Sequence, residues 1–274
     1  MWHPPEQRSR SGIAYHRSGH GPAVLLLHGI PGCAASWAST ADLLPDSLDV
    51  VVPDLLGFGA SDRPSTLGDL HAASQAEALA ELIDEIELGS FTVIGHDFGG
   101  PVAIALSGIR RGHVDALGLL ATNVFPDTPI PFPLGMAALP VVGRWARRVL
   151  FSSPSLRMML RRGTGPQTSS PEPTIYLGDP GQQRSISTIF GGSLTRLEEL
   201  YRPIESQLED LTCPTLVGVG DQDPFFSIAH GQRTASAAGT TLRLYTRAGH
   251  FLPHERPREV AADIMRLLDA VRAD

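Results

Sequence analysis

Short apolar runs alternate with longer amphipathic segments along most of the chain. Runs of strand length end at a glycine or a polar residue, and the segments between them repeat their apolar positions at helical spacing. This alternation is typical of an α/β domain with a mostly parallel central sheet flanked by helices. The pattern predicts strands at 23–29, at the start of 48–64, and at 91–95, 116–121, 214–219 and 241–246. It predicts helices at 34–46, 74–88, 99–110 and 257–271.

One region interrupts this rhythm, from Phe125 to about Gln207. It is rich in proline, glycine, serine and arginine, and no strand stands out in it. Residues 141–162 predict one or two short basic helices, and 185–208 predict a pair of helices. We therefore expect a core formed by 1–124 and 208–274, with 125–207 inserted as a helical cap.

Composition fits an ordinary globular protein of 274 residues, with 42% hydrophobic and 19% charged residues. The net charge of −7 gives no reason to expect a nucleic-acid partner. The first ten residues lack the apolar stretch of a signal peptide, and no apolar run is long enough to span a bilayer. We expect a cytoplasmic protein with no membrane partner, and we interpret the cap arginines as a solvated helix face.

The stretch GHDFGG, residues 95–100, carries the first chemical signal. It follows a predicted strand, opens a predicted helix and places Asp97 between two glycines. A nucleophile on a tight strand-to-helix turn needs such small neighbours, and the backbone N–H of Phe98 then faces developing negative charge. Alone, the stretch also fits a glycine-rich turn with an aspartate cap, so its meaning depends on other segments.

Two further segments of the sequence indicate how the GHDFGG stretch should be interpreted. HGIPG, residues 28–32, ends a predicted strand and can present the Ile30 N–H as a second donor to the same charge. In the C-terminal part, Asp223 and His250 each follow a predicted strand. The chain order of nucleophile, acid and histidine is that of the α/β-hydrolases.

Over essentially its whole length, the chain resembles the α/β-hydrolase family. The aspartate at the elbow is similar to the branch that contains epoxide hydrolases, haloalkane dehalogenases and haloacetate dehalogenases. The resemblance implies an α/β-hydrolase fold, a catalytic triad of Asp97, His250 and Asp223, and an oxyanion hole from the Ile30 and Phe98 N–H groups. Asp221 fits the family pattern less well than Asp223.

An aspartate nucleophile suits a substrate with an electrophilic saturated carbon. Attack by serine would leave an ether that water and a histidine cannot cleave. Attack by Asp97 leaves an alkyl ester, which water activated by His250 can hydrolyse at the carbonyl carbon. Epoxides and alkyl halides are the two obvious substrates.

The choice between them favours an epoxide hydrolase. Such enzymes resemble this chain in the HGIP loop and in a cap tyrosine followed by arginine, here Tyr201 and Arg202, with Tyr176 as a second tyrosine. A tyrosine hydroxyl donates to the ring oxygen as it opens. Haloalkane dehalogenases typically have tryptophan after the nucleophile, where this chain has Phe98, although Trp145 or Asn123 could supply another donor.

Other interpretations stay open. A haloacetate dehalogenase would need arginines near the elbow, where Phe98 and Pro101 stand. An esterase- or lyase-like enzyme would use Asp97 as a base, and a ligand-binding module would keep the pocket without chemistry. We expect a small hydrophobic substrate and water, no cofactor or metal, and a monomer or homodimer. The substrate-binding residues that we predict are His28, Trp37, Trp145 and Phe225.

Overall fold

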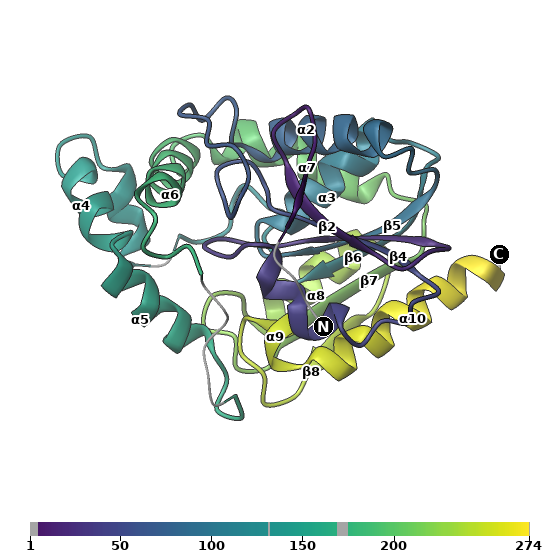
Figure 1. Ribbon diagram of the computed structural model, residues 1–274. Coiled ribbons are helices and arrows are strands. Elements are labelled where there is room, and N and C mark those ends of the chain that lie inside the picture. The colour runs from purple at the N-terminus through teal and green to yellow at the C-terminus, as the bar shows by residue number, and fades with distance from the viewer. Residues whose placement is uncertain (1–4, 131, 169–174, 274) are drawn as a thin grey trace.

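In the computed structural model, the chain forms an eight-stranded sheet flanked by helices, and the helices of the expected cap lie beyond the sheet (Figure 1). The structure describes residues 5–130, 132–168 and 175–273. Strand order across the sheet is β1-β2-β4-β3-β5-β6-β7-β8. The strands are β1 (Gln7–Arg8), β2 (Ala14–Ser18), β3 (Ala23–Leu27), β4 (Asp49–Pro53), β5 (Phe91–His96), β6 (Val114–Leu120), β7 (Thr215–Gly220) and β8 (Leu242–Tyr245).

The six strands from β4 to β8 in this order are parallel, and at the other edge β2 runs antiparallel to both β4 and β1. Alternate residues of the central strands face opposite sides. In β3, Leu25 and Leu27 join the core on one face, whereas Val24 and Leu26 join the core on the other. Burial on both faces explains why these strands are continuous apolar runs.

Helices cover both faces of the sheet (Figure 1). One face carries α2 (Ala72–Glu85), α3 (Gly99–Ile109), α7 (Leu197–Glu209) and α8 (Ile228–Ala237). The other carries η1 (Ala34–Trp37), α1 (Ala38–Ala41), α9 (Leu252–Glu255) and α10 (Pro257–Ala273). Local signals set several helix starts: Ser227 caps α8 through its hydroxyl, and a proline opens α10.

The cap consists of η2 (Leu134–Ala138), α4 (Gly143–Leu150), α5 (Ser153–Gly163) and α6 (Pro180–Ser193). These elements lie at the left of Figure 1, beyond the body of the sheet. The Asp179 side chain caps α6 by accepting the Gln182 N–H at 2.7 Å, and Pro180 occupies the first turn. Residues 131 and 169–174 of the expected cap lie outside the described residues.

The structure confirms the α/β-hydrolase fold and its parallel sheet, with three differences from the expected elements. β1, β2 and α8 were not expected. The helix expected at 34–46 is only η1 followed by α1. α7, expected as part of the cap, packs against α3 and α8 of the core. Among the described helices, none has the length and apolar character needed to cross a bilayer.

Candidate active site

Asp97 stands at a sharp corner between β5 and α3. Its φ is 51°, in the left-handed region that a non-glycine residue rarely adopts. The corner is held by the Asp97 N–H, which donates to the Leu120 carbonyl at 3.0 Å, and by the Asp97 carbonyl, which accepts the Thr122 hydroxyl at 2.6 Å. This strained backbone lifts the carboxylate out of the turn.

The glycines around this corner are required by close packing. A methyl group at Gly95 would lie 2.2 Å from the Gly99 carbonyl oxygen, and one at Gly99 would lie 2.4 Å from the Leu27 carbonyl oxygen. At Gly29, it would lie 2.3 Å from Cβ of Asp97. The glycine pattern in the sequence therefore reflects backbone packed directly against the elbow.

His250 follows β8 and is hydrogen-bonded to Asp223, which follows β7. The Nδ1–H of His250 donates to Oδ2 of Asp223 at 2.9 Å. Oδ1 of Asp223 accepts the backbone N–H groups of Phe225 and Phe226 at 2.7 and 3.1 Å. Both oxygens of this fully buried carboxylate are therefore engaged, which fixes the plane of the imidazole.

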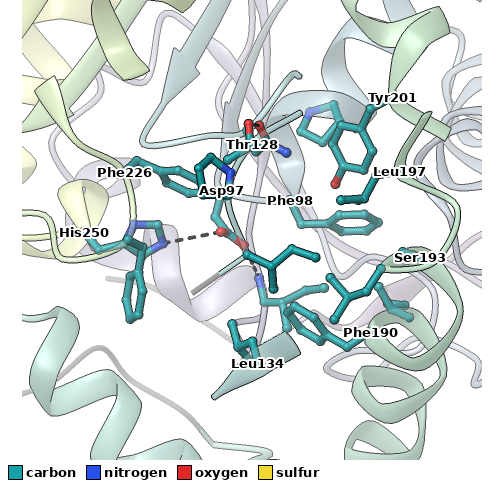
Figure 2. Close-up of a pocket in the computed structure, with 18 of the residues that line it drawn as sticks. Asp97, Phe98, Thr128, Leu134, Phe190, Ser193, Leu197, Tyr201, Phe226 and His250 are labelled. Carbon is teal, nitrogen blue, oxygen red and sulfur yellow. Dashed lines mark hydrogen bonds and ion pairs between the residues drawn. The ribbon is translucent and has the colours of Figure 1, made fainter. Parts of the chain in front are cut away.

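The other imidazole nitrogen of His250 faces the elbow. Nε2 lies 3.5 Å from Oδ2 of Asp97 (Figure 2). Burial opposes protonation of His250, but the charges and hydrogen bonds of Asp223 and Asp97 outweigh it and raise the pKa of the imidazole to about 10. Burial also opposes ionisation of Asp97, yet its interactions with His250 and with the Ile30 N–H hold the pKa of Asp97 below the ordinary value. Asp97 and His250 thus form an ion pair at neutral pH.

The second oxygen of Asp97 lies in a backbone donor site. The Ile30 N–H donates to Oδ1 of Asp97 at 2.8 Å. The Phe98 N–H, at the start of α3, has no hydrogen-bond acceptor among the described residues. The arrangement presents donors to an oxyanion formed at the Asp97 carboxyl group.

Two buried histidines support these loops as neutral groups. His28 donates from Nδ1 to the Gly29 carbonyl and accepts the Leu55 N–H at Nε2. His96 donates from Nε2 to the His250 carbonyl at 2.9 Å. Burial lowers the pKa of each to about 4, so neither adds a positive charge beside the triad.

Sequence reasoning missed Glu255, which organises the loop that carries His250. Its side chain is buried and accepts the N–H groups of Gly249, Phe251 and, from the base of the cap, Gly165. Only its position five residues after His250 in GHFLPHE could have drawn attention to it. Thr122 and Gln182 were missed as well, because they act through backbone groups of distant loops.

A cavity of about 170 Å³ opens above Asp97 and His250. Its walls are mainly apolar, from core and cap alike, and include the predicted Phe225. The lining side chains that are polar are Asp97, Asn123, Thr128, Ser193, Tyr201 and His250. No arginine lines the described cavity, which leaves a substrate carboxylate without a cationic partner.

Few of these polar groups have a free donor. The Asn123 amide nitrogen donates to the Phe125 carbonyl, and its oxygen accepts the Thr128 hydroxyl at 2.6 Å. The Tyr201 hydroxyl, by contrast, has no hydrogen-bond partner among the described residues. Burial and the charge of Asp97 raise its pKa, so it stays protonated. Figure 2 shows the Tyr201 hydroxyl directed into the cavity, on the side of Asp97 away from His250.

Tyr176, the second acid predicted from the sequence, lies away from the cavity over Asp97. Tyr176 follows the cap segment outside the described residues and does not line the cavity. Burial, together with the nearby charge of Asp54, raises its pKa. Its position beside Asp54 and Arg63 places it next to the 54–63 loop.

Three predicted binding residues also lie away from the cavity. Trp37 is fully buried in the core between the sheet and α10, because η1 turns its ring inward. Trp145 projects from α4 and is 68% exposed, so it cannot supply a donor to the cavity. His28 lies beneath the Ile30 loop with both ring nitrogens occupied. The described residues contain no cluster of ligands suited to a metal ion.

Comparisons with known proteins agree with this fold. The alpha/beta hydrolase fold family matches residues 22–257. The chain is 28% identical to haloalkane dehalogenase 2 of Mycobacterium tuberculosis, over 94% of this chain and 91% of that protein. It is 26% identical to epoxide hydrolase 3 of Xenopus tropicalis, over 91% and 73%. The solved structure of the epoxide hydrolase CorEH superimposes with a TM-score of 0.78 at 22% identity, covering 94% and 95% of the two chains.

Proposed function

The chain belongs to the alpha/beta hydrolase fold family and is a hydrolase, and we propose that it converts small apolar epoxides to diols through a covalent ester on Asp97. The observation that carries the proposal is the pairing of two groups in one cavity. Asp97 offers a carboxylate in the place of a serine nucleophile, and Tyr201 offers a hydroxyl that no described residue engages. A nucleophile and an acid on opposite sides of a substrate are what epoxide opening requires.

In the first step, Oδ2 of Asp97 attacks a ring carbon, since Oδ1 is held by the Ile30 N–H. The carbon–oxygen bond of the ring breaks, and its electron pair passes to the ring oxygen, which takes the proton of Tyr201. The product is a hydroxyalkyl ester of Asp97. Burial, the larger cause of the raised Tyr201 pKa, persists after Asp97 loses its charge, so the tyrosinate takes a proton back from solvent.

In the second step, water attacks the carbonyl carbon of the ester. His250 takes a proton from the water, and the oxyanion at the carboxyl group accepts the N–H groups of Ile30 and Phe98. The intermediate collapses by breaking the bond to the alkyl oxygen, which receives the proton from His250. The collapse leaves Asp97 as a carboxylic acid, and its proton passes to His250, so the diol leaves and the resting ion pair is restored.

The pKa of His250 fits this order of events. In the resting enzyme, two carboxylates raise it to about 10, so the imidazole is protonated and paired with Asp97. Alkylation converts Asp97 to a neutral ester and removes one of the two charges. The pKa of His250 then falls, the imidazolium releases its proton to solvent, and the neutral imidazole can act as a base when the ester is ready for hydrolysis.

An epoxide is favoured over a halide because of the donors available in the cavity. A departing halide carries its charge into the site and needs N–H or O–H donors to stabilise it. Phe98 follows the nucleophile and has no side-chain donor, Trp145 is 68% exposed on α4, and one of the two N–H groups of the Asn123 amide already donates to the Phe125 carbonyl. An epoxide keeps its leaving oxygen attached, and one acid, Tyr201, is sufficient.

The test uses His250→Gln, which leaves Asp97 able to attack but removes the base for ester hydrolysis. The intact mass of this variant is measured after separate exposure to styrene oxide and to 1-bromobutane, with the His250→Gln/Asp97→Asn double variant as control. We expect the protein to gain the mass of the whole epoxide. Peptide mapping should locate this mass at Asp97, and the control should show no gain. A gain equal to the butyl group, with none from the epoxide, would instead assign the protein as a dehalogenase.

A further inference from the structure

Gln182 connects the cap to two loops of the core through both ends of its side chain. It lies in the first turn of α6 and is 1% exposed. Its Nε2 donates to the Pro31 carbonyl at 2.8 Å, and its Oε1 accepts the Gly59 N–H at 3.0 Å. A buried amide with donor and acceptor both satisfied across three segments holds those segments in one arrangement.

The Pro31 carbonyl belongs to the residue after Ile30, whose N–H contacts Asp97. Proline has no N–H of its own, so this turn has one fewer backbone donor to stabilise it. On the preceding side, the Gly29 carbonyl is held by His28. Gln182 therefore connects the cap, by a direct hydrogen bond, to the loop that carries the Ile30 N–H.

The partner loop, 54–63, is itself firmly anchored. Asp54 accepts the N–H of Ala34, the first residue of η1 after the Ile30 loop, at 2.6 Å and the Ala60 N–H at 2.7 Å. Arg63 donates to the Gly59 carbonyl at 2.7 Å and pairs with Asp179, the N-cap of α6, at 3.0 Å. The start of α6, the 54–63 loop and the Ile30 loop thus form one hydrogen-bonded unit.

We infer that Gln182 is a positioning residue for the oxyanion hole, through which the cap helix α6 sets the place of the Ile30 N–H. This inference rests on the proposed function, because it concerns the ester formed on Asp97. In this role the cap helps to stabilise the oxyanion, in addition to lining the substrate cavity.

The two chemical steps respond differently to a displaced Ile30 N–H. During alkylation, negative charge leaves Asp97, so the hydrogen bond to Oδ1 weakens and its loss does not slow attack. During ester hydrolysis, negative charge builds on the carboxyl oxygen, so the same donor stabilises the transition state. Removing one oxyanion donor slows comparable enzymes about 10²–10³-fold, and we expect roughly tenfold for a donor that is displaced but still present.

The chain offers a matched control in the next residue. Gln183 has the same side chain, but its Nε2 donates to the Ser153 hydroxyl and the Leu177 carbonyl, both within the cap. Gln182→Met and Gln183→Met each replace an amide by an apolar group of similar length. Single-turnover rates of ester formation and ester hydrolysis are measured by rapid quench with styrene oxide. We expect Gln182→Met to accumulate the alkyl-enzyme at an unchanged rate of formation, and Gln183→Met to match the wild type.

A second measurement does not depend on any substrate. The backbone amide resonance of Ile30 should shift in Gln182→Met and stay in place in Gln183→Met. Equal slowing of both chemical steps, or an unmoved Ile30 resonance, would overturn the inference. If the proposed function fails, the wild type will form no diol and His250→Gln no adduct, whereas the Ile30 resonance will still report whether Gln182 positions the loop.

Discussion

The core half of the cavity is built from polar groups anchored to backbone, whereas the cap half is almost wholly apolar. Asp97, Asp223 and His250 each follow a strand, and hydrogen bonds to neighbouring loops fix their side chains. The cap contributes mainly apolar side chains that line the cavity and pack on the hydrophobic core: Leu134, Met159, Ile189, Phe190 and Leu194. This difference indicates that the core determines the type of reaction and that the cap largely determines which substrate fits.

Tyr201 and Gln182 cross this division. Tyr201 lies on α7, which was expected in the cap but packs on α3, so the acid of the proposed reaction is supported by the core. Gln182 lies on α6 of the cap and reaches down to the Pro31 carbonyl. Variants of core residues and of cap residues can therefore test whether the two parts have these separate roles.

The largest effect is expected from Asp97→Asn. An amide cannot act as the nucleophile, so we expect the rate of epoxide hydrolysis to fall by at least about 10⁴-fold. The measurement is diol formation with styrene oxide, and circular dichroism serves as the folding control. Residual activity near that of the wild type would place the chemistry away from the elbow.

Tyr201→Phe is expected to lower the rate of ester formation from an epoxide by about 10²-fold or more, because the ring oxygen loses its acid. Tyr176→Phe is the matched control and should retain the wild-type rate, since Tyr176 does not line the cavity. Single-turnover rates for both variants separate the two tyrosines. Equal losses in the two would contradict the assignment of the acid to Tyr201.

The pKa of His250 should respond to a change at Asp97. Two carboxylates raise it to about 10, and Asp97→Asn removes the charge of one of them. The pKa must therefore fall, and the imidazole loses its proton at lower pH than in the wild type. NMR titration of the His250 ring in both proteins measures this difference. An unchanged pKa would show that Asp97 is not coupled to His250.

The smallest effects are expected in the cap. Phe190 lines the cavity and stacks on Phe151, so Phe190→Ala should raise KM by roughly tenfold and leave ester hydrolysis unchanged. Trp145 is mostly exposed, so Trp145→Ala should change neither kinetic constant and should alter stability by less than about 0.5 kcal/mol. Steady-state kinetics measures KM and kcat of both variants, and thermal unfolding measures their stability. A large rise in KM for Trp145→Ala would place the substrate path over α4.

Much of the core could be read from the sequence because its signals are local. A strand buried on both faces is a continuous apolar run, and the elbow needs glycines wherever backbone approaches Asp97. The pairing of His250 with Asp223 follows from parallel strands, whose carboxyl ends meet at one edge of the sheet.

The remaining features of the site depend on the direction of side chains and on contacts between segments far apart in the sequence. The hydrophobic periodicity of the sequence reports neither. Trp37 and Trp145 were predicted to bind substrate, but η1 buries Trp37 in the core and α4 leaves Trp145 68% exposed. Tyr201 was favoured over Tyr176 because Arg202 follows it, but only the structure shows that Tyr201 lines the cavity and Tyr176 does not. Gln182 bonds to a carbonyl 151 positions away, so no local pattern marks it.

The most direct test of the central claim, that Asp97 is the nucleophile, is a single turnover in H₂¹⁸O with enzyme in excess over an epoxide. If Asp97 forms an ester that water cleaves at the carbonyl carbon, the first diol contains no ¹⁸O, and peptide mapping finds one ¹⁸O in Asp97. If Asp97 acts as a base for direct attack by water, the first diol carries the label and Asp97 does not. That second result would contradict the account.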